Sequence, residues 1–177
     1  MVTESLATRL RRTIRDVPDF PKPGILFRDI TTVLLDGNLV RECLEAMWRP
    51  YEGEAQVIAG IESRGFILGA SIAAQYSLPF VPLRKPGKLP AATHRESYAL
   101  EYGTDALEIH QDAVRPGTKV LIVDDLLATG GTASAAARLV EQCGGDVLGL
   151  SFLVELADLG GRSRLDGRRV DALLTYE

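Results

Sequence analysis

Cysteine and histidine are scarce in this chain of 177 residues, which contains two of each. Cys43 and Cys143 lie a hundred positions apart, a spacing that fits neither a metal-binding pair nor a redox motif. Because only His94 and His110 could join them, we expect no zinc centre. A chain of this length can bury roughly 70% of its unfolded surface, so it needs no disulfide to hold a core.

Long apolar runs and an excess of positive charge are also missing. No hydrophobic run approaches the roughly 20 residues of a membrane-spanning helix, and charges interrupt the N-terminal segment where a signal peptide would be apolar. We therefore expect a cytoplasmic protein with no membrane partner. The formal net charge is −4, whereas proteins that bind nucleic acid non-specifically normally carry a basic excess. Nucleic acid is not an expected partner either.

The apolar pattern predicts a single α/β domain. Residues 3–16 and 38–48 have helical spacing, and a proline-rich segment at 18–24 separates them. Short apolar runs at 57–61, 80–83, 120–123 and 147–154 are typical of buried strands, and helical patterns follow the first and third of them. Strands of this kind that alternate with helices indicate a parallel-sheet core flanked by helices. An N-terminal appendage and a long insertion between Leu83 and Lys119 complete the chain.

The segment 119–133 carries the clearest chemical pattern. An apolar strand ends in Asp124 and Asp125, and Gly130 and Gly131 then lead into an alanine-rich helix. Ligands of an open parallel sheet bind at the carboxyl ends of the strands, and the first turn of a helix offers unpaired amides to an anion. We expect a phosphate in this loop, with the two carboxylates accepting hydrogen bonds from the hydroxyls of a ribose. A simpler alternative is that the acidic pair only initiates the helix.

This segment closely resembles the phosphoribosyl-pyrophosphate motif of the type I phosphoribosyltransferases. Segments 20–30, 62–66, 84–90 and 97–103 are similar to the adenine-specific members of that family, in the same order along the chain. The similarity extends from Phe20 to Glu177. The Phe-Pro-x-Pro-Gly sequence at 20–24 and the Leu-Glu-Tyr-Gly sequence at 100–103 are what point to adenine. The resemblance implies the type I fold, with a small hood at about residues 1–35 and a flexible flap at about 84–105.

The resemblance also implies a reaction. Members of the family move ribose 5-phosphate from phosphoribosyl pyrophosphate to N9 of adenine, which gives AMP and pyrophosphate and salvages the purine. The expected cofactor is Mg²⁺, held mainly through the substrate's oxygens, so no dedicated set of protein metal ligands is expected. The expected partners are adenine and phosphoribosyl pyrophosphate, and the expected assembly is a homodimer.

The roles that the resemblance implies fall on four groups of residues. The catalytic group contains Glu101 as the acceptor of the adenine proton, Arg64 beside the pyrophosphate, and Asp124 and Asp125 at the ribose. The 5-phosphate loop comprises Ala128, Thr129, Gly130, Gly131 and Thr132. Glu62 and Ser63 lie in the loop expected to hold the pyrophosphate, a loop that often carries a non-proline cis peptide. The flap residues Arg84, Lys85 and Lys88 are basic candidates for contact with the leaving pyrophosphate, and Tyr102 of the flap is an expected substrate-binding residue. The hood contributes Leu26, Phe27 and Arg28, whose main-chain groups and ring would contact the base.

Two other functions are compatible with the sequence. A transferase for hypoxanthine, guanine or xanthine would share the phosphoribosyl motif. A regulator that keeps the fold as a ligand sensor would need a nucleic-acid-binding module or a basic surface, and neither is evident in the sequence.

Some charged residues have simpler explanations than ligand binding. The basic residues at 84–88 could form a solvated run of charge. Near the C-terminus, four arginines alternate with acidic residues and are expected to form a solvated basic face: Arg162, Arg164, Arg168 and Arg169.

Overall fold

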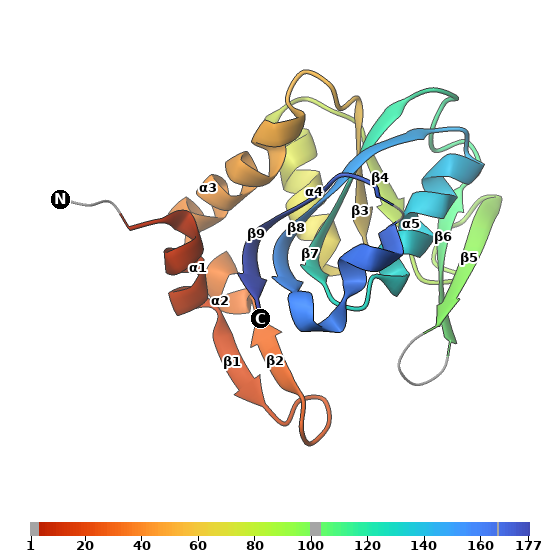
Figure 1. Cartoon of the computed structure of the whole chain (residues 1–177). Helices are drawn as coiled ribbons and strands as arrows, with labels where there is room; N and C mark the ends of the chain where they lie inside the picture. Colours follow the sequence, from red (N-terminus) through yellow and green to blue (C-terminus); the bar gives the residue numbers. More distant parts are fainter. Residues whose placement is uncertain (1–3, 100–103, 166) are drawn as a thin grey trace.

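The computed structural model of the chain describes residues 4–99, 104–165 and 167–177. Within these residues, a five-stranded sheet lies at the centre, in the order β4-β3-β7-β8-β9 (Figure 1). Every neighbouring pair in it is parallel. The strands are β3 (Val57–Ile61), β4 (Phe80–Leu83), β7 (Lys119–Leu127), β8 (Asp146–Leu156) and β9 (Val170–Tyr176). The predicted parallel-sheet core is confirmed.

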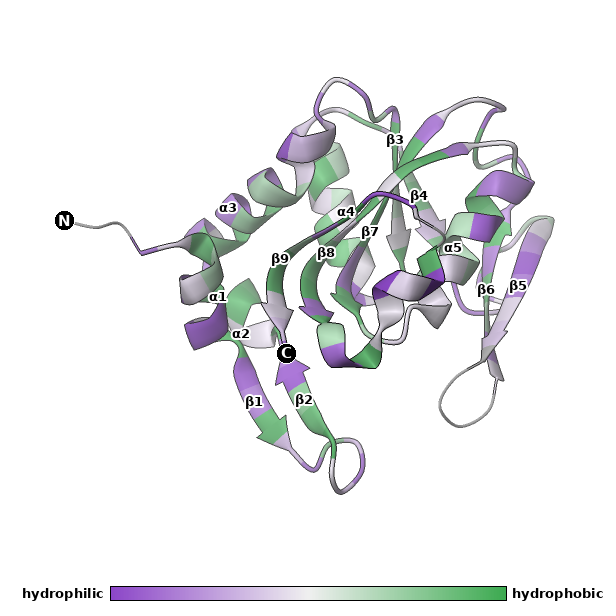
Figure 2. Cartoon of the chain, in the orientation of Figure 1, coloured by the Kyte–Doolittle hydropathy of each residue, from purple (hydrophilic) through white to green (hydrophobic). Residues whose placement is uncertain are grey.

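Helices cover both faces of the sheet. One face packs against α1 (Leu6–Thr13), α3 (Gly37–Trp48) and α4 (Arg64–Gln75), and the other against α5 (Gly131–Gln142). Side chains alternate between the two faces, as a strand requires: Ile58 and Leu121 join the first cluster, Ala59 and Ile122 the second. Figure 2 shows the central strands as largely apolar. Among the described residues, no helix is long and apolar enough to cross a membrane.

Two antiparallel hairpins lie outside the main sheet (Figure 1). The first, β1 (Arg15–Pro18) with β2 (Leu26–Asp29), belongs to the segment predicted as the hood. The second, β5 (Thr93–Ala99) with β6 (Thr104–His110), belongs to the insertion predicted as the flap and packs against α5. Short helical segments make the remaining connections: α2 (Thr31–Leu34), η1 (Arg49–Tyr51), η2 (Ala157–Leu159) and η3 (Gly161–Leu165).

The N-terminal helix is shorter than its spacing predicts. It ends at Thr13, and Ile14 already has an extended backbone. Arg15 and Asp16 then enter β1, where each forms an ion pair with its cross-strand partner, Asp29 and Arg28 respectively. Charges that could have formed the polar side of a helix therefore stabilise a hairpin instead.

Of the four arginines expected to form a solvated basic face near the C-terminus, Arg162, Arg164 and Arg169 are exposed, as expected, and Arg168 is half-buried. Arg162 binds both carboxylate oxygens of Glu155, which is only 6% exposed. Arg168 pairs with Glu141 of α5, and Arg169 donates to the Pro50 carbonyl oxygen. These side chains connect separate elements of the fold.

A tight contact between β8 and η1 lies beside an irregularity in the ladder between β7 and β8. The ladder between β7 and β8 shifts at Gly149, and the fully buried Tyr51 ring packs directly on that glycine. The Tyr51 hydroxyl donates to the Leu150 carbonyl oxygen at 3.2 Å. A β-carbon at position 149 would overlap the ring, so only glycine fits there.

We predict that Gly149→Ala destabilises the protein by about 2 kcal/mol, because a methyl group forced into a packed core displaces its neighbours. For a domain of this size, the midpoint of thermal unfolding should fall by about 4–8 °C, measured by circular dichroism. Gly37→Ala is the matched control, since open space surrounds Gly37 at the start of α3 and alanine favours helix. Equal midpoints for the two variants would contradict the contact.

Candidate active site

The candidate site lies where β3 and β7 end. The two strands are parallel neighbours with Gly60 opposite Val123, so the residues that follow each strand meet at one edge of the sheet. Arg64 begins α4, and its Nε lies 2.7 Å from Oδ2 of Asp125. A β-carbon at Gly65 would lie 2.7 Å from the Val123 carbonyl oxygen, so glycine allows α4 to approach β7 closely.

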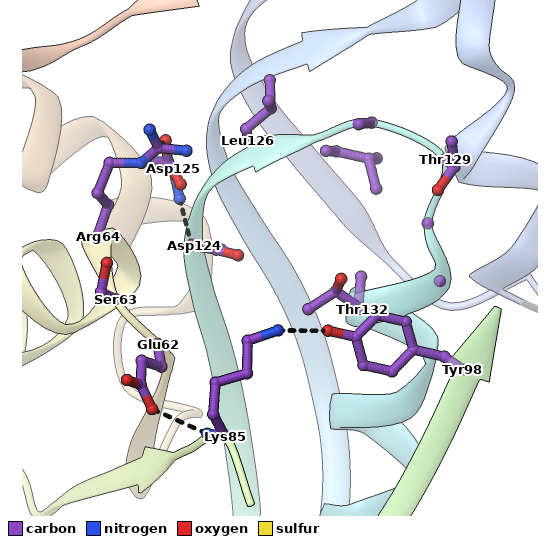
Figure 3. A pocket seen from close by; sticks show the side chains of 15 residues that line it. Glu62, Ser63, Arg64, Lys85, Tyr98, Asp124, Asp125, Leu126, Thr129 and Thr132 are labelled. Atoms are coloured by element: carbon purple, nitrogen blue, oxygen red, sulfur yellow. Dashed lines mark hydrogen bonds and ion pairs between the residues drawn. The ribbon is translucent and has the colours of Figure 1, made fainter. Parts of the chain in front are cut away.

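A cavity of about 360 Å³ opens at this edge (Figure 3). Of the residues predicted to bind substrate or to act in catalysis, it brings together Glu62, Ser63, Arg64, Lys85, Asp124, Asp125, Ala128, Thr129, Gly130, Gly131 and Thr132. The peptide bond between Glu62 and Ser63 is cis, the geometry that the resemblance implies for this loop.

The two carboxylates of the site are neighbours on β7, where Asp125 is buried and Asp124 is half-buried. Asp125 is only 4% exposed, and its amide donates to Oδ1 of Asp124 at 2.9 Å. Burial raises the pKa of Asp124 well above its ordinary value, and the neighbouring charge of Asp125 raises it further. Burial also raises the pKa of Asp125, although the Arg64 guanidinium opposes that shift. A ligand that donates hydroxyl hydrogen bonds would therefore stabilise the ionised pair.

The loop after β7 has the features of an anion site. Gly130 has φ +79° and precedes α5, and no side chain caps the first turn of that helix. The first amides of a helix have no partner within it and attract an anion. Thr129 and Thr132 add hydroxyls at the same rim (Figure 3). The loop can therefore hold a phosphate group.

Gly161 of η3 supports this loop from behind, and the sequence analysis did not identify it. A β-carbon at Gly161 would overlap the Ala128 carbonyl oxygen, and one at Gly130 would overlap the Gly161 carbonyl oxygen. The two backbones thus touch without side chains between them. Because Gly130 and Gly161 are about thirty positions apart in the sequence, no local sequence pattern could have indicated this contact.

The predicted flap cations occupy different positions. Lys85 lines the cavity, where its Nζ donates to the Tyr98 hydroxyl at 3.1 Å (Figure 3). The same Nζ also forms an ion pair with Asp105. Arg84 instead donates to the Lys88 carbonyl oxygen at 3.0 Å, and neither Arg84 nor Lys88 is among the lining residues. The roles predicted for Arg84 and Lys88 stay predictions.

The hood borders a second cavity, of about 430 Å³. Its lining includes Phe27, Phe20 and Arg64, and Arg64 lines the first cavity as well, so the two adjoin there. The Arg64 guanidinium lies 5.4 Å from the centre of the Phe27 ring. Apolar walls with a few polar groups suit a flat heterocycle. Of the other predicted hood residues, Leu26 is 46% exposed and the Arg28 side chain pairs with Asp16.

Some site residues were missed, and others lie outside the described residues. Tyr98, Leu126, Leu127 and Ala133 line the first cavity without having been predicted. Leu126 and Leu127 directly follow the acidic pair, so their position beside a predicted ligand could have indicated them. Glu101 and Tyr102 fall in segment 100–103, which the structure does not describe.

Known proteins are similar to this chain in sequence and in fold. The family model of the phosphoribosyl transferase domain matches residues 33–171. An adenine phosphoribosyltransferase of Chelativorans is 52% identical over 177 residues, which cover 98% of each chain. The crystal structure of that enzyme from Rhodothermus marinus is 53% identical, has a TM-score of 0.92 and is matched over 97% of this chain and 98% of its own.

A third relative was solved with ligands. The Saccharomyces cerevisiae adenine phosphoribosyltransferase, complexed with adenine and an imino-altritol bisphosphate, is 39% identical with a TM-score of 0.90, and the match covers 96% of this chain and 98% of that one. The fold, the loop after β7 and these matches define a phosphoribosyltransferase of type I. Within that class, the chain belongs to the adenine phosphoribosyltransferase family.

We predict that Asp124→Asn stabilises the protein while it weakens its activity. The raised pKa means that the folded state binds a proton more tightly than the unfolded state, so stability falls as pH rises from the unfolded pKa toward the folded one. At pH 7.5 the neutral amide should raise the unfolding midpoint by about 2–4 °C, the equivalent of about 1 kcal/mol. The gain should vanish below about pH 4, where the unfolded aspartate is also protonated.

Activity in the same variant should fall about 10- to 100-fold in kcat/KM, since a hydrogen bond to a charged group contributes about 1.5–3 kcal/mol. Calorimetric scans across pH and steady-state kinetics measure the two effects. An unfolding midpoint below that of the wild type at pH 7.5 would contradict the assigned electrostatics.

Proposed function

We propose that this protein transfers the 5-phosphoribosyl group of phosphoribosyl pyrophosphate to N9 of adenine, which yields AMP and pyrophosphate and salvages the purine. One observation carries the proposal: an acidic pair near the end of β7, with Asp125 paired to Arg64, is followed by a glycine-bearing loop at the same cavity. The enzymatic class comes from the family, and the base from the adenine-specific relatives.

The sugar phosphate would occupy the first cavity. Amides and hydroxyls of residues 128–132 suit the 5-phosphate, which also gains from the positive end of the α5 dipole. Asp124 and Asp125 lie on β7 just before this loop, where they can accept hydrogen bonds from the two ribose hydroxyls. Those bonds favour the ionised carboxylates and offset the burial that raises their pKa values.

The pyrophosphate would leave toward the basic side of the cavity. The bond from the anomeric carbon to the pyrophosphate oxygen breaks as the bond to N9 forms, so the leaving group gains negative charge. Arg64 and Lys85 line this side, and each is already held by a carboxylate, Asp125 and Asp105 respectively. Preorganised cations of this kind stabilise the transition state more than the ground state.

Magnesium fits this site as a cofactor carried by the substrate. Among residues 4–99, 104–165 and 167–177, no group of three or more His, Cys, Asp and Glu side chains is arranged to hold a metal ion. Glu62 and Asp124 offer carboxylate oxygens to the cavity, which matches a Mg²⁺ that keeps waters and binds mostly through phosphates. Bound there, the ion would neutralise charge on the pyrophosphate.

The base would lie in the second cavity, near Arg64 and beside the Phe27 ring. Main-chain groups of Leu26 and Arg28 would hydrogen-bond the Watson–Crick edge of the purine, and a base with a 6-oxo group would leave buried partners unpaired. Glu101 is proposed as the acceptor of the N9 proton. The homodimer and the cytoplasmic location implied by the resemblance also stay proposals.

We predict that the purified protein forms AMP from adenine only when phosphoribosyl pyrophosphate and Mg²⁺ are both present. A pyrophosphate-release assay over adenine, hypoxanthine, guanine and xanthine measures the specificity, and adenine should exceed each 6-oxopurine by at least about 100-fold in kcat/KM. A preference for a 6-oxopurine would favour the other transferases. Retention of nucleic acid on filters at physiological salt, without AMP formation, would favour the regulator.

For Glu101→Gln we predict that kcat falls about 100-fold or more, while the KM for phosphoribosyl pyrophosphate stays within about twofold. Loss of a general base typically removes a factor of 10²–10⁴ from turnover and leaves the binding of the other substrate intact. Steady-state kinetics with each substrate varied in turn separates the two effects. An unchanged kcat would remove Glu101 from the proposed role.

A further inference from the structure

The ring of Tyr176, at the end of β9, lies between two arginines. The Arg28 guanidinium is 3.9 Å from the ring centre and the Arg11 guanidinium 4.5 Å. Tyr176 is only 7% exposed, and Arg11 also donates to the Thr175 carbonyl oxygen at 2.7 Å. The last residues of β9 therefore contact both α1 and β2, and Figure 1 shows the C-terminus beside the end of β2.

The two faces of the hood hairpin contact different parts of the protein. Val17, Phe27 and Asp29 share one face, because cross-strand partners and every second residue point the same way, and all three line the second cavity. Asp16 and Arg28 are opposite each other on the other face, where they form an ion pair. Arg28 therefore points away from the cavity and toward Tyr176.

The hairpin of the hood does not belong to the main sheet. In the part of the chain that the structure describes, β1 and β2 pair with each other and not with the main sheet. An isolated two-stranded hairpin is marginally stable in water, so its position depends on side-chain contacts with the body of the protein. A ring between two guanidinium groups is a favourable contact of this kind, and partial burial strengthens it.

We infer that Tyr176 is a positioning residue for the base: through Arg28, it fixes the orientation of β2 and so places Phe27 and the main chain of residues 26–28 against the purine. This rests on the proposed function. The 5-phosphate loop lies on β7 and α5, which do not depend on the hairpin. Loss of the Tyr176 ring should therefore affect adenine far more than phosphoribosyl pyrophosphate.

Kinetics of Tyr176→Leu test the inference. The KM for adenine should rise about fivefold or more, while the KM for phosphoribosyl pyrophosphate stays within about twofold. Tyr176→Phe keeps the ring and should restore the wild-type KM to within about twofold. Tyr76→Leu is the matched control, because it removes an aromatic contact with Trp48 (ring centres 4.9 Å apart) at a place far from the site. It should leave both KM values unchanged.

Hydrogen exchange provides a readout that needs no catalysis. In Tyr176→Leu, amides of β1 and β2 should exchange faster than in the wild type, while those of β3 and β7 keep their rates; in Tyr76→Leu, the hairpin should exchange as in the wild type. Unchanged hairpin exchange in Tyr176→Leu would overturn the inference, as would an equal rise of both KM values or an unchanged KM for adenine. If Tyr176→Leu does not fold, Arg28→Met removes the same contact from the hood side and carries the same expectations.

Failure of the proposed function gives a different result. In that case the wild-type protein forms no AMP, whereas failure of the inference leaves an active wild type whose adenine KM does not depend on the ring at position 176.

Discussion

The close approach of β3 and β7 at their carboxyl ends is the constraint on which the site depends. Parallel pairing with Gly60 opposite Val123 brings the start of α4 against the acidic end of β7. Gly65 makes this possible, since a β-carbon there would meet both the Val123 carbonyl oxygen and Oδ1 of Asp124. Arg64 then reaches Asp125, and one ion pair joins the start of α4 to β7.

The site is built against the ordinary preferences of a folded chain. Two neighbouring carboxylates lie where desolvation raises their pKa values, and α5, which follows Gly130, has no side-chain cap. Both features cost stability, and under the proposed function a bound hydroxylated sugar phosphate would offset both costs. The packing on both faces of the sheet supplies the stability that these features lack.

The sequence predicted the elements whose pattern is local. The β3, β7 and β8 strands are buried on both faces, so they appear as apolar runs, and the phosphate loop lies within one continuous segment. The first hood strand was not predicted because Arg15 and Asp16, which pair across the hairpin with Asp29 and Arg28, extend the charged side of the preceding helical pattern. The second was not predicted because its four residues show no apolar alternation. The β9 strand was missed because Asp171 interrupts its apolar pattern near the arginines.

Contacts between distant segments could not be predicted from spacing. Gly161 contacts the loop after β7, and Tyr176 contacts Arg28. Each contact joins segments that are far apart in the sequence and meet only in the folded structure. The adenine-specific roles of Glu101 and the hood came from the family resemblance, since backbone contacts to a base leave little trace in side-chain identity.

A crystal structure with bound AMP would show whether the nucleotide occupies this edge of the sheet. We expect the phosphate on the amides of residues 128–132, the ribose hydroxyls on Asp124 and Asp125, and the purine on the Phe27 side of Arg64. A nucleotide bound in another crevice, with this edge of the sheet empty, would contradict this expectation.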